Sequence, residues 1–202
     1  MECTYNKQYL SMFLKNSILI LFILLIVSCQ PKEKFNPIIF DNSQLEKFFI
    51  SSKKIIVNDS YKPIFSKNNI ENQLRVSPIV RLKSWINNNI SQIGNENTLK
   101  INILDASISR IEIENKDAKK YEGKNIYSYK ISYLLEYELY DNSDILISNT
   151  IVESIRSTTS NKYVSLNELE IITDEIVLLA LKELVKESKV QLKKYMGGYI
   201  LD

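Results

Sequence analysis

The sequence predicts an α+β fold, in which an antiparallel sheet of about four strands carries two helices on one face, in the order β-α-β-β-β-α. Two kinds of apolar pattern predict it. Residues 127–139 alternate between apolar and polar side chains, as in a strand with one buried face, whereas residues 77–94 and 165–195 repeat apolar residues at helical spacing. The chain has 202 residues, 45% of them hydrophobic and 25% charged, which is an ordinary globular composition.

The first predicted strand is the β-branched run at 53–57, which ends at Asn58-Asp59. A helix is expected to follow at Ser77-Pro78, because serine is a preferred N-cap and proline suits the first helical position. Gly94 stands where a helix C-cap glycine belongs. Between these ends runs one apolar stripe, widened by Trp85, that consists of Ile79, Leu82, Ile86, Ile90 and Ile93.

Three strands are predicted next. Residues 99–113 change their apolar phase midway, which indicates a bulge or a kink, and a charged loop at 114–125 follows. The strand at 127–139 is the clearest, and the composition of residues 141–144 predicts a hairpin turn to a partner strand at 145–158. Ser165 and Glu168 then match a capping box at the start of a helix that we expect to continue to about Tyr195, before Gly197 and Gly198.

A row of tyrosines lies on one face of the predicted strand 127–139, and its members are Tyr127, Tyr129, Tyr133 and Tyr137. Tyrosine is common at interfaces, so an exposed docking face is one interpretation. The other is that the row forms the core under the two helices. We expect core, because the helices need a long apolar surface to cover them, and we expect a partner surface at the Phe-rich segment 35–49 or at the 114–125 loop.

The N-terminal region has the features of an export signal. Lys15 precedes an apolar run from Ile18 to Val27, which is too short to span a bilayer. Ile26-Val27-Ser28-Cys29 resembles the bacterial lipobox, and the resemblance implies cleavage before Cys29 and acylation of that residue. The natural start is Met1 or Met12. We therefore expect a signal peptide at 1–28, a lipidated tether at 29–52 and a periplasmic domain at 53–202.

Composition excludes several kinds of active site. The chain has no histidine and only two cysteines, so we expect no catalytic residues of the histidine type, no metal site and no cofactor. A net charge of +2 argues against a nucleic-acid partner. Glu136 and Glu138 have the spacing of a general acid/base pair, but their alternation with apolar residues favours a solvated strand face.

With the lipobox in place, the order of elements over about residues 53–196 resembles two families of envelope lipoproteins. One is the auxiliary lipoproteins of ABC-type lipid transporters, which carry a signature containing arginine and tryptophan in their helix. The segment Arg81–Trp85 of this chain is similar to that signature but does not match it. The other is the lipopolysaccharide-assembly lipoprotein of the outer membrane. The resemblance implies a non-enzymatic envelope lipoprotein, anchored in the membrane by lipid, that binds another envelope protein, with lipid or lipopolysaccharide transport as the more specific role. Gln30, rather than aspartate, after Cys29 resembles release to the outer membrane, facing the periplasm.

Two alternatives remain open. A periplasmic module that binds a lipid or another small ligand would need an apolar cavity between the sheet and the helices. A carboxylate-dependent hydrolase would need a pocket lined by two close carboxylates.

Overall fold

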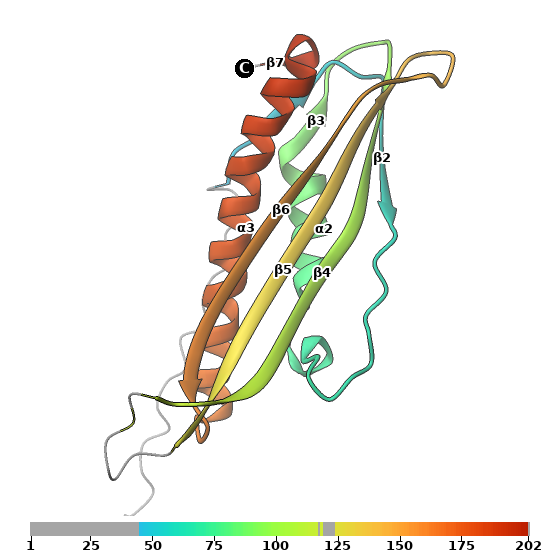
Figure 1. Ribbon diagram of the computed structural model, residues 1–202. Coiled ribbons are helices and arrows are strands. Elements are labelled where there is room, and N and C mark those ends of the chain that lie inside the picture. Colours follow the sequence, from blue (N-terminus) through green and yellow to red (C-terminus); the bar gives the residue numbers. More distant parts are fainter. Residues whose placement is uncertain (1–44, 117, 119–123, 202) are drawn as a thin grey trace, which may run out of the picture. The chain divides into compact units, whose positions relative to one another are not determined.

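A computed structural model describes residues 45–116, 118 and 124–201. Its main layer is a four-stranded sheet in the order β2-β4-β5-β6, formed by β2 (Lys54–Asp59), β4 (Thr98–Glu114), β5 (Asn125–Tyr140) and β6 (Leu146–Asn161) (Figure 1). β4, β5 and β6 form an antiparallel meander, whereas β2 is parallel to β4. The α+β class and the four strands are therefore as predicted. The sheet was expected to be antiparallel throughout, but β2 and β4 are parallel, because the chain returns from β2 to β4 through a helical crossover.

Two helices, α2 (Pro78–Asn89) and α3 (Leu166–Met196), pack on one face of this sheet. In Figure 1, α2 lies behind the strands and α3 runs along the left, beside β6. Side chains of a single strand face reach both helices. The Tyr133 hydroxyl donates to the carbonyl oxygen of Pro78 in α2 at 3.2 Å, and the Tyr137 hydroxyl donates to Ser188 Oγ in α3 at 3.0 Å. The predicted placement of both helices on the same face is confirmed.

The tyrosine row is core. Tyr129, Tyr133 and Tyr137 are fully buried, and Tyr127 is partly buried beside them. Burial among apolar neighbours raises the pKa of Tyr133 and Tyr137, so both hydroxyls stay protonated and act as donors. The outer face of β5 is more exposed, as its alternation predicted.

A second sheet of three short strands was not predicted. Its order is β3-β1-β7, formed by β3 (Ile90–Gln92), β1 (Phe48–Ile50) and β7 (Ile200–Leu201). β1 pairs in parallel with β3 and antiparallel with β7. β1 lies within residues 29–52, which the sequence predicts to be the tether. The side chain of Leu45 is also buried, so the folded domain begins at or before this residue. Two 3-10 turns, η2 (Glu71–Gln73) and η3 (Gly197–Tyr199), complete the described elements.

The first helix is shorter than predicted. It ends at Asn89, and Ile90 begins β3 instead of a further turn. Gly94 is therefore no helix cap. It adopts a φ of +152°, and a Cβ at this position would lie 3.2 Å from Ser51 Oγ and from the Ser52 amide nitrogen. Only glycine fits this close approach without strain.

The remaining predictions for the chain's regular elements are confirmed. β4 carries the predicted irregularity, a register shift between Ile103 and Asp105. α3 begins with the predicted capping box, in which the Glu168 amide donates to Ser165 Oγ and the Ser165 amide donates to the Glu168 carboxylate. No helix within the described residues is long and apolar enough to cross a membrane.

Candidate functional site

The feature that best fits a binding site is the free edge of β6. In the described part of the chain, this 16-residue strand pairs with β5 on one side and with no strand on the other. Its sequence contains no lysine and no proline, and its only charged side chains are Glu153 and Arg156. Proteins usually protect long edge strands with lysine, proline or several charged side chains, because the unpaired N–H and C=O groups of an edge can pair with another strand. β6 therefore lacks the usual protection of a solvent-facing edge.

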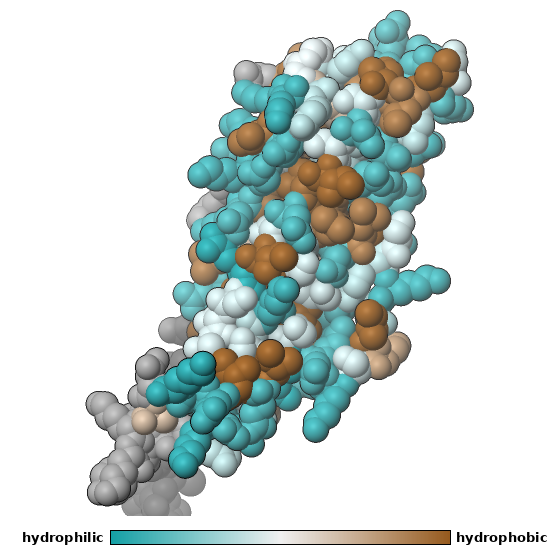
Figure 2. Space-filling view, in the orientation of Figure 1, coloured by the Kyte–Doolittle hydropathy of each residue, from teal (hydrophilic) through white to brown (hydrophobic). Residues whose placement is uncertain are grey.

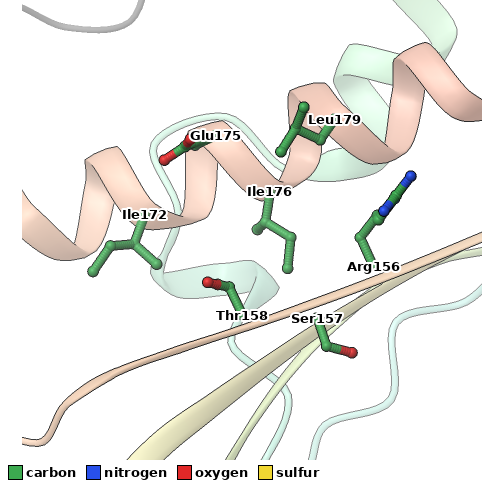
Figure 3. A pocket seen from close by; sticks show the side chains of 7 residues that line it. All are labelled: Arg156, Ser157, Thr158, Ile172, Glu175, Ile176 and Leu179. Atoms are coloured by element: carbon green, nitrogen blue, oxygen red, sulfur yellow. The ribbon is translucent and has the colours of Figure 1, made fainter.

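α3 runs beside this edge and forms a groove with it (Figure 3). The groove encloses about 200 Å³. Ile176 extends from α3 toward β6, whereas Thr158 and Arg156 extend from the strand toward the helix and Ser157 points away (Figure 3). The residues that line the groove are Arg156, Ser157, Thr158, Ile172, Glu175, Ile176 and Leu179.

The groove has an apolar floor on the helix side. Leu179 is part of the apolar repeat of residues 165–195, whose helical spacing predicts a buried side chain. It is nevertheless 50% exposed, because α3 lies toward the β6 edge of the sheet. Ile172 is partly buried nearby. An exposed leucine beside a free strand edge is suited to receive an apolar side chain from an added strand.

Polar contacts join β6 to α3 beside the groove. Arg156 Nε donates to Glu183 Oε2 at 2.6 Å, and Ser154 Oγ donates to the Ala180 carbonyl oxygen at 2.9 Å. Both charged side chains are substantially solvated, so the ion pair adds little stability. Its effect is positional, because it holds the Arg156 guanidinium against the helix at one end of the groove.

The carboxylates that the sequence singled out lie elsewhere. Glu136 and Glu138 occupy the sheet face opposite the helices, and Asn102 Nδ2 donates to Oε2 of both, at 2.9 Å and 3.1 Å. Both residues are partly exposed, which agrees with the predicted solvated strand face. Neither lines the β6 groove or the second pocket described next, so the two-carboxylate pocket that a hydrolase would need is not formed at these sites.

A second pocket of about 300 Å³ lies between η2 and the start of α3. An ion pair between Arg75 Nε and Glu170 Oε1, 3.2 Å apart, joins its two sides. No residue of a strand lines this pocket, so it offers no strand edge to a partner. Within the described residues, no group of three or more histidine, cysteine, aspartate or glutamate side chains is placed to hold a metal ion.

The expected partner surfaces are only partly available. In the Phe-rich segment 35–49, Phe48 is buried and its ring packs edge-to-face on Trp85, with centroids 5.8 Å apart. Phe48 therefore stabilises the domain and is not a docking residue. Phe35 and Phe40 lie outside the described residues, as do Cys29 and much of the 114–125 loop. Sequence reasoning missed the β6 groove, although the absence of lysine and proline from β6 was a usable signal.

No protein-family model matches the sequence, and no curated protein matches it either. Solved structures with some similarity include a minor lipoprotein from Acinetobacter baumannii, at 11% identity and a TM-score of 0.39, which covers 72% of this chain and 93% of that one. The rare lipoprotein B from Shewanella oneidensis is similar at 14% identity and a TM-score of 0.33, covering 69% and 98%. A neuraminyllactose-binding hemagglutinin homologue from Helicobacter pylori is similar at 12% identity and a TM-score of 0.32, covering 82% and 88%.

Proposed function

We propose that the protein is a non-enzymatic envelope lipoprotein, anchored by lipid at Cys29, that binds an extended segment of another envelope protein along β6. The observation that carries the binding part is the 16-residue edge of β6 beside the groove with α3, which pairs with no strand among residues 45–116, 118 and 124–201. The lipobox-like sequence at Cys29 supports the anchor, and Gln30 after it supports an outer-membrane location facing the periplasm. A role in lipid or lipopolysaccharide transport is the more specific proposal, and it rests on the resemblance in element order.

Strand addition uses both parts of this site. The free N–H and C=O groups of β6 would bind the partner's backbone about 4.8 Å away, which gives affinity without sequence preference. Alternate side chains of the added strand would then face α3, where Ile172, Ile176 and Leu179 form an apolar wall. Selectivity is therefore for an extended segment with an apolar residue at the position that faces Leu179.

The competing idea of a small-ligand module needs space between the sheet and the helices. The side chains that occupy this layer, among them Tyr133, Tyr137 and Leu181, are fully buried against one another. The two pockets described above lie at the margins of α3 instead. This arrangement favours a protein partner over a ligand held within the domain.

Site-specific photocrosslinking tests the proposal. A photoreactive amino acid at Leu179 in the intact chain, expressed in its native cells, should give one discrete adduct with an envelope protein, and mass spectrometry should place the attachment in an extended segment. The matched control is Ile171, an exposed isoleucine of the same helix that does not line the groove. Adducts of equal yield at both positions, or none at Leu179, would contradict binding in this groove.

A further inference from the structure

The tip of the hairpin between β5 and β6 presents consecutive apolar side chains to solvent. Ile145 is 64% exposed and Leu146 is 45% exposed, and Ile147 beside them is also exposed. Figure 2 shows an apolar patch at the upper right, where Figure 1 places this hairpin. We call Ile145, Leu146 and Ile147 the hairpin tip.

The turn itself holds the tip in this position. Asp141 Oδ1 accepts hydrogen bonds from the amides of Ser143 and Ile145, both at 2.8 Å. Asp144 adopts a φ of +58°, as expected in a tight turn. The turn therefore satisfies its backbone groups locally, and the apolar side chains that follow are displayed by a well-defined structure.

Two pairs of lysine and tyrosine flank the tip. Tyr140 lies opposite Leu146 in the sheet, and the Lys100 ammonium lies 3.8 Å from the centroid of its ring. On the other side, Ser148 Oγ donates to the Tyr195 carbonyl oxygen at 2.9 Å, and the Lys194 ammonium lies 4.9 Å from the Tyr195 ring centroid. Apolar side chains flanked by tyrosine and lysine are the composition that proteins place at the boundary between lipid headgroups and acyl chains.

The charges around the tip decide which kind of membrane fits. Lys53 Nζ donates to Asn142 Oδ1 of the turn at 2.8 Å and adds a third positive charge to Lys100 and Lys194. Asp141, Asp144, Glu136 and Glu138 supply four negative charges in the same region. Because positive charge is not in excess around the tip, the contact would depend on apolar insertion and would not require anionic lipids.

The described part of the chain begins at this end of the domain. The Leu45 carbonyl accepts a hydrogen bond from Asn89 Nδ2 at 2.8 Å, and Glu46 pairs with Lys189 at 2.9 Å, so the described chain begins beside the C-terminal halves of both helices. Lys53 then contacts the turn directly. Residues 30–44, between Cys29 and Leu45, span at most about 55 Å when fully extended.

We propose that the hairpin tip, with its flanking Lys–Tyr pairs, rests in the headgroup region of the membrane that holds the anchor. The inference rests on the proposed lipid anchor at Cys29. Three partly exposed apolar side chains give only marginal binding by themselves, so the anchor is what makes this contact persistent. The contact would fix the orientation of the domain, with the β6 groove along its side and available to a partner.

Tryptophan fluorescence in vesicles tests this contact. The native Trp85 is fully buried and gives a constant background. The Leu146→Trp variant of the full lipidated chain, purified in detergent and reconstituted into phosphatidylcholine vesicles, should show a blue-shifted emission and lose at least half of the added intensity when the lipid acyl chains are brominated. The matched control is Ile111→Trp at the far end of the sheet, where Ile111 is 47% exposed, and its emission should not be quenched beyond the wild type.

The outcomes separate the two proposals. Protein that floats with the vesicles while Leu146→Trp remains unquenched would overturn the contact and leave the anchor standing, and would indicate that the tip serves a protein partner. Equal quenching at both positions would also overturn it, because no orientation would then be fixed. Protein that fails to float would contradict the anchor and the inference together.

Discussion

Arg81 and Asp174 form a buried ion pair between the two helices, although they are 93 positions apart in the sequence. The Arg81 NH2 group donates to Asp174 Oδ1, and the two side chains are only 8% and 10% exposed. The pair lies where α2 and α3 pack together on the sheet, so it sets the position of α3 relative to α2. Because α3 also forms one wall of the β6 groove, this pair contributes indirectly to the shape of the candidate site.

Asp174→Ala should lower the free energy of unfolding by about 3–5 kcal/mol, because it leaves the buried Arg81 guanidinium without its carboxylate. Thermal and urea denaturation would measure this loss. Glu183→Ala is the matched control on the same helix, since its pair with Arg156 is substantially solvated and should contribute less than about 1 kcal/mol. Equal losses in both variants would show that burial of the Arg81–Asp174 pair has no special weight.

The same aspartate predicts a pH dependence. Burial raises the pKa of Asp174 above its ordinary value, although Arg81 acts in the opposite direction. A raised carboxyl pKa in the folded state means that the folded protein binds a proton more readily than the unfolded chain. The free energy of unfolding therefore falls as the pH rises from the pKa of the unfolded chain to the higher pKa of the folded protein. As the pH rises above about 4, the wild type should therefore lose stability relative to Asp174→Asn, which has no carboxyl group to ionise at this position. Denaturant titrations from pH 3 to 7 would measure it, and a change of opposite sign would contradict the raised pKa.

Tyr133→Ala should cost about 3–5 kcal/mol, because it removes a fully buried ring from the centre of the tyrosine row. Tyr133→Phe keeps the ring and removes only the hydrogen bond to the Pro78 carbonyl oxygen, so its loss should be about 1 kcal/mol. Tyr163→Ala is the surface control, since Tyr163 is 89% exposed. Tyr133→Ala should have the lowest melting temperature, Tyr133→Phe an intermediate one and Tyr163→Ala one close to the wild type. An unchanged melting temperature for Tyr133→Ala would disprove the core position.

Ser165→Ala should lower stability by about 1 kcal/mol, because it removes the side-chain acceptor for the Glu168 amide at the start of α3. Ser157→Ala on the outer face of β6 is a matched serine control and should leave stability nearly unchanged. Chemical denaturation followed by circular dichroism would compare them. If both substitutions were equally neutral, the capping box would not contribute to the 31-residue helix.

The sequence predicted those elements whose pattern is long enough to be periodic. β5 follows from its alternation, and α3 follows from Ser165, Glu168 and the apolar repeat behind them. The second sheet escaped prediction because its strands have only three, three and two residues, too few for any period. Ile90 shows the limit well. It continues the apolar stripe of α2, but it is buried as the first residue of β3, and either role satisfies the same pattern.

The candidate groove depends on tertiary geometry that no local pattern contains. Leu179 has the spacing of a core residue in α3, yet it is half-exposed because α3 lies toward the β6 edge of the sheet. The pairing of Arg156 with Glu183 likewise joins residues that only the packing of α3 on β6 brings together. The sequence shows that β6 contains no lysine or proline, but its position at the edge of the sheet is known only from the strand order.

The proposed lipid anchor predicts that the two cysteines of the chain respond differently to substitution. Cys29 is expected to carry the lipid, and Cys3 would be removed with the signal peptide. Cys29→Ser should therefore accumulate as uncleaved precursor and incorporate no radiolabelled palmitate, since no thiol remains at the processing site. Cys3→Ser is the matched control and should mature and partition into the detergent phase like the wild type. Because both variants lose one sulfhydryl, a defect caused by thiol loss in general would affect them equally. Normal cleavage and labelling of Cys29→Ser would disprove the anchor, and with it the reason for placing the hairpin tip at a membrane.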